Sequence, residues 1–388
     1  MKEIKCVPKL RFKGFEERWG NINLGELLSF KNGLNADKGK YGKGVKFINV
    51  LDIINNDFIT YDKIIGKVVV SEKEIEKNEV IYGDILFQRS SETREEVGQA
   101  NVYLDRQRSC VFGGFVIRGR AKKVYEPVFI NNLLKTDLSR KEITTRSGGS
   151  TRYNVGQDSL NQVIINLPTL PEQQKIASFL TAVDARIQQL SRKKELLEQY
   201  KKGMMQKLFS QELRFKDENG QDFPEWVVKK LGQIVESIKS GKSTNDLEGE
   251  IPLYGSTGLI GKCQKASHEG EFILIARVGA NAGTLNIAKG KFGVSDNTLI
   301  VQCFTNLNLS FLYFYLKFWN LSRLVFGSGQ PLITGGQLKS IKLLIPSKNE
   351  QQKIANYLSA LDAKIEGLTT QINHTQTFKK GLLQQMFV

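Results

Sequence analysis

The feature that most constrains this 388-residue chain is a stretch of 38 residues that occurs twice. Residues 172–209 read EQQKIASFLTAVDARIQQLSRKKELLEQYKKGMMQKLF, and residues 350–387 read EQQKIANYLSALDAKIEGLTTQINHTQTFKKGLLQQMF. The two copies align without a gap at an offset of 178, and 17 of the 38 paired positions are identical. A repeat of this length predicts a duplicated architecture.

Each copy has the features of a long helix. Thr169 with Glu172, and Ser347 with Glu350, match the capping box that satisfies amide donors at a helix start. Apolar side chains then recur every seven residues, a spacing that favours a coiled-coil partner over burial in a globular core. We predict that the two helices, each reaching roughly 57 Å, pack on each other; the alternative is two ordinary amphipathic helices in separate domains. The predicted residues of the helix and partner interface are Ile176, Val183, Leu190, Leu197, Met204, Ile354, Leu361 and Leu368.

The repeat extends beyond the helices. The sequence Leu-Arg-Phe-Lys stands at residues 10–13 and again at 213–216, and a tryptophan and a Leu-Gly pair follow it in both places. Between these matching ends the sequences diverge, which indicates one scaffold with two different binding regions. Short strand-like runs between glycines predict mixed, largely antiparallel β structure. We therefore predict an α+β fold with four parts: a domain at residues 1–171, a long helix at 172–209, a second domain at 210–349 and a second long helix at 350–388.

The composition favours an anionic partner. The net charge is +16 and the pI is near 9.5, and lysine and arginine supply affinity for nucleic acid by neutralising phosphates. The four cysteines lie far apart without a C-x-x-C pair, and the N-terminus lacks an apolar signal segment, so we expect a reducing cytoplasm. No apolar run approaches the length of a transmembrane span, so we expect no membrane partner.

The search for catalytic groups is negative. Gly241, Lys242 and Ser243 resemble the end of a phosphate-binding P-loop, but the first glycine of that motif would fall on Glu236. The chain has only two histidines, far apart in the sequence, which argues against a histidine metal site and imidazole base catalysis. No G-x-G-x-x-G loop or amino-methyltransferase motif occurs, so we expect no metal, no bound S-adenosylmethionine and no catalytic residue in this chain.

The positive signals are for DNA binding, in loops that follow strand-like runs. Arginine matches guanine edges or phosphates, and amide side chains pair with adenine; these candidates are Arg89, Arg94, Arg146, Arg152, Arg277, Asn154, Asn281, Asn297 and Gln330. Hydroxyl groups more often contact phosphate and fix the register; these candidates are Ser90, Ser150, Thr151 and Ser328. Glycine-rich loops add Lys40, Lys43 and Lys242. The alternative for each is a solvated or turn-forming side chain.

With its duplicated units and divergent middles, the chain resembles the specificity subunit of Type I restriction-modification systems. The residues that carry this resemblance are Leu-Pro-Glu-Gln-Gln-Lys-Ile at 170–176, its counterpart at 350–354, and the runs in which a strand leads into arginine at 83–89 and 273–277. The second unit departs slightly, with Pro-Ser-Lys-Asn before its long helix.

The resemblance implies a division of labour among several proteins. Two target-recognition domains would each read one half of a bipartite double-stranded DNA sequence, and two antiparallel helices would fix the distance between the halves. Two modification subunits would methylate adenine N6, and restriction subunits would translocate and cleave unmodified DNA. S-adenosylmethionine, ATP and Mg²⁺ would belong to these partners. Two other readings stay open: a self-sufficient DNA-processing enzyme, and a coiled-coil adaptor that binds no nucleic acid.

Overall fold

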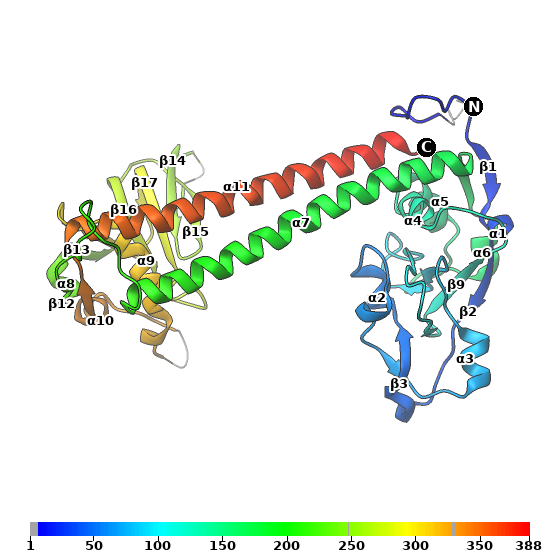
Figure 1. Cartoon of the computed structure of the whole chain (residues 1–388), viewed down its shortest axis with the longest axis horizontal. Coiled ribbons are helices and arrows are strands. Elements are labelled where there is room, and N and C mark those ends of the chain that lie inside the picture. Colours follow the sequence, from blue (N-terminus) through cyan, green and yellow to red (C-terminus); the bar gives the residue numbers. More distant parts are fainter. Residues whose placement is uncertain (1–6, 247, 328–330) are drawn as a thin grey trace. The chain divides into compact units, whose positions relative to one another are not determined.

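The computed structural model of the chain describes residues 7–246, 248–327 and 331–388 (Figure 1). The chain forms two compact units, Met1–Gln189 with Ile372–Val388, and Leu190–Gln371. Each unit therefore contains a mixed α/β region and parts of two long helices, α7 (Leu170–Phe209) and α11 (Lys348–Met386).

The β structure of the first unit is mainly antiparallel. Its largest sheet has the order β2-β9-β5-β7, a smaller sheet has the order β4-β3-β8 with β3 and β8 parallel, and two further pairs join β1 to β11 and β6 to β10. The strands are β1 (Gly20–Asn23), β2 (Leu28–Asn32), β3 (Tyr41–Ile48), β4 (Lys67–Val68), β5 (Ile85–Gln88), β6 (Ser90–Ser91), β7 (Ala100–Val102), β8 (Val111–Phe112), β9 (Val116–Ala121), β10 (Tyr153–Asn154) and β11 (Ile164–Leu167). The shorter helices are α1 (Leu24–Leu27), α2 (Val50–Ile54), α3 (Glu72–Asn78), α4 (Pro127–Leu134), α5 (Asp137–Thr145) and α6 (Gln157–Asn161), with 3-10 turns η1 (Lys38–Lys40) and η2 (Tyr61–Lys63).

The second unit repeats this plan with a larger sheet. Its strands follow the order β13-β18-β16-β17-β14-β15, in which only the β14–β17 pair is parallel, and β12 pairs with β19. The strands are β12 (Val227–Lys230), β13 (Val235–Ser240), β14 (Ile251–Gly255), β15 (Gly258–Cys263), β16 (His268–Ala276), β17 (Leu285–Val294), β18 (Thr298–Cys303) and β19 (Lys342–Ile345). The helices are α8 (Leu231–Ile234), α9 (Leu309–Trp319) and α10 (Gly335–Ser340), with the 3-10 turn η3 (Leu321–Leu324).

The central strand of each main sheet is buried on both faces. In β5, Ile85 and Phe87 belong to the core that includes α4, whereas Leu86 points into a separate apolar cluster. In β16, Ile273 belongs to the core that includes α9, and Leu274 points into another cluster. A strand that buries side chains on both faces reads as a continuous apolar run, and this is the pattern just before Arg89 and Arg277 in the sequence.

The two long helices run antiparallel within each unit. In the first unit, Lys379 Nζ of α11 lies 2.6 Å from Asp184 Oδ1 of α7. In the second unit, Lys201 of α7 pairs with Asp362 of α11. Both pairs join the same two positions of the repeat, because Lys201 and Lys379, like Asp184 and Asp362, differ by 178.

The predicted interface residues lie on the inner sides of these helices. Leu197 and Met204 are half-buried, and it is Met205 that enters the second unit's core. The helix therefore presents a wider apolar face than a strict seven-residue seam, as expected where a helix also packs on a domain. The predicted interface residues that are buried are Ile176, Val183, Leu190, Ile354, Leu361 and Leu368.

The capping boxes predicted for these helices are wrong in one respect. Both helices begin two residues before the predicted glutamates, as a capping box would require, but the glutamate side chains bind elsewhere. Both carboxylate oxygens of Glu172 accept from Arg11, at 2.7 and 2.8 Å. Both oxygens of Glu350 accept from Arg214, at 3.1 and 2.9 Å. A bidentate arginine binds a carboxylate more strongly than one backbone amide does, and these arginines come from the repeated Leu-Arg-Phe-Lys segments.

Among the described residues, no helix has the length and apolar character needed to span a membrane.

Candidate nucleic-acid interface

In both units an arginine stands at the end of the central strand and is fixed by the same pair of backbone hydrogen bonds. The Arg89 amide donates to Phe115 O at 2.9 Å, and its carbonyl accepts from Val155 N at 3.0 Å. The Arg277 amide donates to Asn297 O at 2.9 Å, and its carbonyl accepts from Ile333 N at 2.9 Å. Each arginine is therefore held between the start of a neighbouring strand and the segment that follows a Gly- and Ser-rich sequence, at residues 146–154 in the first unit, here called the Gly/Ser loop, and at residues 327–331 in the second.

The Gly/Ser loop of the first unit lies directly beside Ser90. Strands β6 and β10 pair Ser90 with Asn154, and Ser90 Oγ lies 2.6 Å from Asn154 Oδ1. The amide nitrogen of Asn154 donates to Arg152 O at 3.0 Å. Both ends of the Asn154 amide are thus engaged within the protein, and they would have to be released before this side chain could pair with an adenine edge.

The turn of this loop requires glycine at one position. Gly149 has a φ of +115°, and an added Cβ would lie 2.1 Å from Arg152 O. A side chain there would meet both backbone strain and a backbone clash. The turn leaves Ser150, Thr151 and Arg152 exposed to solvent, so three predicted DNA-binding side chains project from one tight segment.

Helix α5 supports the loop that follows Arg89. Arg94 donates to Thr144 O at 3.2 Å, near the C-terminal end of α5, where the helix dipole favours a cation. Arg140 donates to Glu95 O at 3.0 Å and Val97 O at 2.5 Å. Burial lowers the pKa of Arg140 to about 10, so the guanidinium stays charged at neutral pH.

Arg146 takes part in an ion pair on the same helix. Its Nη2 lies 2.6 Å from Glu142 Oε1, and both side chains are part-buried. Part of the hydrogen-bonding capacity of Arg146 is therefore used within the protein.

A cavity of about 580 Å³ opens beside Arg89. The guanidinium of Arg89 donates to Gly114 O at 3.3 Å, and this glycine lines the cavity together with Tyr41 and Phe115. Lys40 and Lys43 flank Tyr41 and are exposed, with Lys40 Nζ 3.5 Å from Asp37 Oδ2.

Sequence reasoning missed three exposed apolar residues of this cavity. Phe115 is 62% exposed, and Leu51 and Ile65 are 64% and 89% exposed. The signal that could have found Phe115 is its position after the Gly113-Gly114 pair, where an aromatic side chain has little to pack against. Clustered exposed apolar side chains on a soluble protein often mark a binding surface.

The second unit gathers the matching residues at the carboxyl end of β16. Arg277 is half-buried, and its Nε is buried without a hydrogen-bond partner among the described residues. A buried donor without a partner is costly, which suits a group that binds a ligand. Asn297 is tied to Arg277 through the backbone, and the neighbouring Thr298 carbonyl accepts from Gly241 N at 3.0 Å, which brings exposed Lys242 close.

Asn281 is exposed in the turn between β16 and β17, with its carbonyl accepting from Thr284 N at 2.9 Å. The remaining candidates of this unit, Ser328 and Gln330, lie outside the described residues.

The segment that resembles a P-loop continues strand β13. Gly241 is buried, and Ser243 N donates to Val294 O at 2.8 Å. A P-loop must lead into a helix whose first amides bind phosphate, and this segment does not. Among the described residues, no group of three or more His, Cys, Asp and Glu side chains could hold a metal ion.

A comparison with known protein families identifies the family to which this duplicated chain belongs. The sequence model of the family described as Type I restriction modification DNA specificity domain matches residues 16–199 and 224–375. The chain belongs to this family.

Relatives of this specificity subunit match along much of its length. The putative type I restriction enzyme MjaX specificity subunit of Methanocaldococcus jannaschii is 28% identical over 403 residues, covering 95% of this chain and 92% of the relative. The type I restriction enzyme StySPI specificity subunit of Salmonella potsdam is 24% identical, covering 87% and 80%.

Solved structures share the fold. The S subunit of a Type-I restriction-modification system from M. genitalium has a TM-score of 0.60 at 18% identity, covering 98% of this chain and 99% of that chain. A chain solved for the complex assembly and conformational transition of the type I R-M system also has a TM-score of 0.60, at 19% identity, covering 97% and 98%.

Family membership decides the general role. The chain is the DNA-specificity component of a Type I restriction-modification complex, and it is a recognition subunit, not a catalytic one. Its partners are DNA and other subunits of that complex.

Proposed function

We propose that each unit reads one half of a bipartite DNA target, the first through the Arg89 and Gly/Ser loops and the second through the Arg277 and Asn297 loops. The observation that carries this proposal is that one arginine in each unit makes two backbone hydrogen bonds to residues in equivalent places of the fold. The backbone around the two arginines is held in the same way, but the neighbouring side chains differ, which suits two domains that recognise different DNA sequences.

The surrounding residues suggest how each reader works. Exposed Arg152, Ser150 and Thr151 are free to contact phosphates, which position the protein without reading sequence. Arg89 and Arg277 occupy fixed positions and have the planar fork that matches guanine O6 and N7. The exposed apolar side chains beside Arg89 suit contact with unstacked or flipped bases.

The finer features of the assembly belong to the same proposal. Two modification subunits would bind one copy of this chain, one for each half-site, and would supply S-adenosylmethionine for methylation of adenine N6. Restriction subunits would add ATP-driven translocation and Mg²⁺-dependent cleavage. The chain itself would carry no cofactor and would act in the cytoplasm, where the DNA is.

The test is to map methylated adenines across the genome of a cell that expresses this chain with its modification subunit. A control strain expresses the modification subunit alone. We expect a new bipartite motif that disappears in the control. A stable complex that leaves the methylation pattern unchanged would contradict the proposed reading of DNA by this chain.

A further inference from the structure

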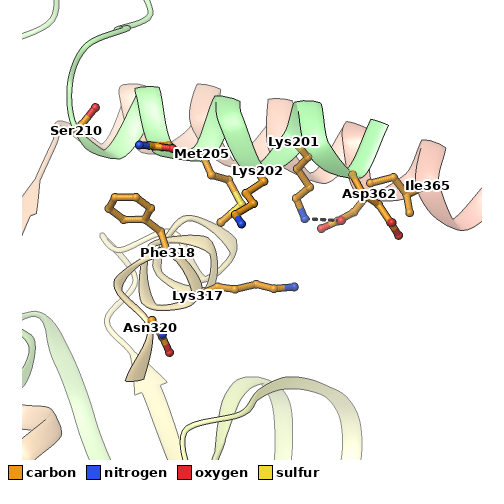
Figure 2. A pocket seen from close by; sticks show the side chains of 11 residues that line it. Lys201, Lys202, Met205, Ser210, Lys317, Phe318, Asn320, Asp362 and Ile365 are labelled. Atoms are coloured by element: carbon orange, nitrogen blue, oxygen red, sulfur yellow. Dashed lines mark hydrogen bonds and ion pairs between the residues drawn. The ribbon is translucent and has the colours of Figure 1, made fainter. Parts of the chain in front are cut away.

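Each unit has a cavity built on the same positions of the internal repeat. In the second unit a cavity of about 710 Å³ is lined by Lys201, Met205, Lys317 and Asp362 (Figure 2). In the first unit a cavity of about 240 Å³ is lined by Lys379, Leu383, Lys135 and Asp184. Three of these four positions correspond at the repeat offset of 178.

The fourth correspondence, between Lys317 and Lys135, follows from how α9 and α4 are anchored. The amide of Asn308, just before α9, donates to Gln351 Oε1 at 2.9 Å. The amide of Glu126, just before α4, donates to Gln173 Oε1 at 3.1 Å. Gln173 and Gln351 are equivalent in the repeat, so the two helices start from the same point, and Lys135 and Lys317 both stand nine residues after it.

The first unit fills this place with its own chain. Asp57 O accepts from Lys135 Nζ at 2.7 Å and from Asn131 Nδ2 at 2.9 Å. The ring of Phe58 packs against the first unit's core and lines what remains of the cavity. Asp57 thus binds Lys135 and Asn131 through its backbone carbonyl, and its side chain and the ring of Phe58 line the cavity formed by the repeated positions.

Among its described residues, the second unit places no counterpart of this segment against its cavity. Residues 33–84, 52 in all, separate β2 from β5, whereas residues 241–267, 27 in all, separate the matching strands β13 and β16. Strand β16 starts five residues earlier relative to Arg277 than β5 does relative to Arg89, so the stretch that contains Asp57 and Phe58 is 20 residues longer in the first unit. No described residue between β13 and β16 lines the larger cavity of the second unit, whereas Asp57 and Phe58 line the equivalent cavity of the first.

The side chains around the open cavity are suited to a similar occupant. Within the described residues, Lys317 Nζ has no oxygen partner and lies 5.6 Å from the Tyr313 ring centre. Phe318 is 36% exposed, and Lys202 is exposed beside it. Figure 2 shows Lys202, Lys317 and Phe318 around the cavity, with Lys201 directed at Asp362. Two carboxylates also line the cavity, but Asp362 pairs with Lys201 and Glu198 lies 3.9 Å from Lys194. Lys202 and Lys317, which have no carboxylate partner among the described residues, and the exposed ring therefore complement a carboxylate next to an aromatic side chain.

We propose that this cavity of the second unit binds a segment of the modification subunit in which an aromatic residue stands beside an acidic one. The inference rests on the proposed function and adds to it a specific docking site. Because the first unit fills the equivalent place with Asp57 and Phe58, the two units bind their modification subunits by different contacts.

Methionine methyl groups provide a direct reporter of this site. The chain has four methionines, of which Met205 lines the cavity and Met386 is buried in the first unit's core. In the full chain labelled with ¹³C at the methionine methyls, we expect the purified modification subunit to shift the Met205 signal, because an aromatic ring would arrive beside it. A peptide copying residues 55–60, Asn-Asn-Asp-Phe-Ile-Thr, is expected to shift the Met205 signal and leave Met386 unchanged, and the same peptide with alanine for phenylalanine is expected to shift neither.

The repeat supplies a matched pair of variants. Lys202 and Lys380 are both exposed and occupy the same Lys-Lys-Gly context of the repeat, but only Lys202 lines the open cavity. We expect K202E to weaken binding of the modification subunit at least tenfold in calorimetry, and K380E to change it less than twofold.

The outcomes separate this inference from the proposed function. If the modification subunit binds the wild-type chain and produces the bipartite methylation motif, while Met205 does not respond and K202E binds normally, the docking site is wrong and the proposed function stands. If the modification subunit does not bind the wild-type chain at all, both are wrong. If K202E and K380E weaken binding equally, the effect is general electrostatics and the docking site is also wrong.

Discussion

Glu350 shows how one residue can join three separated parts of the sequence. Its buried carboxylate accepts from Arg214 and, at 3.0 Å, from Trp226 Nε1. The first unit forms the same arginine pair through Glu172, but Trp19 Nε1 is buried without a partner among the described residues. The repeated sequence features are thus explained by contact, since each arginine before a domain holds the start of the helix that follows the domain.

We predict that E350Q lowers the free energy of unfolding by about 3 kcal/mol, because it removes the buried carboxylate that binds both Arg214 and Trp226 and leaves Arg214 with only the exposed carboxylate of Glu225, at 3.1 Å. Chemical denaturation followed by circular dichroism measures the change. The matched control is E195Q, because Glu195 pairs with Arg192 at 2.7 Å on the exposed surface of α7, where a pair contributes about 0–1 kcal/mol. Equal effects of the two substitutions would refute the role assigned to the buried pair.

Replacement of Arg277 by alanine tests base reading directly. If its guanidinium binds a base edge, R277A should cost about 1–3 kcal/mol on the target sequence and little on unrelated DNA. Fluorescence anisotropy with both duplexes at several salt concentrations separates these terms. The matched control is K239A, which removes an exposed charge from β13 in the same unit. Uniform weakening of R277A across sequences would assign Arg277 to phosphate.

At the level of elements, α7 is the segment whose length should matter most to the target. We predict that inserting or deleting one helical turn between Lys193 and Tyr200 changes the spacing between the two half-sites or prevents assembly. These residues lie in the middle of α7, and most of them are exposed, so the helix can accept a turn of similar sequence. Methylated-motif mapping reads the spacing directly. An unchanged spacing with full activity would exclude a role for α7 as a spacer.

The sequence predicted the long helices better than it predicted the site. A seven-residue apolar repeat and a copied segment are local patterns, so the extents of α7 and α11 could be predicted to within two residues. The two-residue pair of β6 and β10 joins Ser90 to Asn154 across more than 60 residues, and no local pattern predicts such a pairing. Exposure of Phe115 likewise depends on which neighbours the fold provides.

For the molecule as a whole, the two units share a set of structural contacts and differ in the loops and inserted segments around them. The arginine hydrogen bonds, the Glu–Arg pairs and the Lys–Asp pairs between the helices occur in both units. The 25 additional residues of the first unit and the sequences around each arginine loop do not. Variation is therefore concentrated where DNA and partners would be recognised, and the repeated contacts lie where the units hold their own helices.

Because the variable regions are separate from the repeated contacts, we predict that the DNA-recognition region of one unit can be exchanged without affecting the other unit. Replacing residues 31–165 with the corresponding residues of another specificity subunit should change one half of the methylated motif and leave the other half intact. The exchange begins in β2 and ends in β11, so Arg11, Glu172 and both Lys–Asp pairs between the helices remain. Motif mapping in cells that express the chimera gives the answer, and thermal unfolding of the chimera shows whether these contacts have been kept. A folded chimera with both halves of the motif altered would mean that the two readers depend on each other, which the separate cores of the two units do not predict.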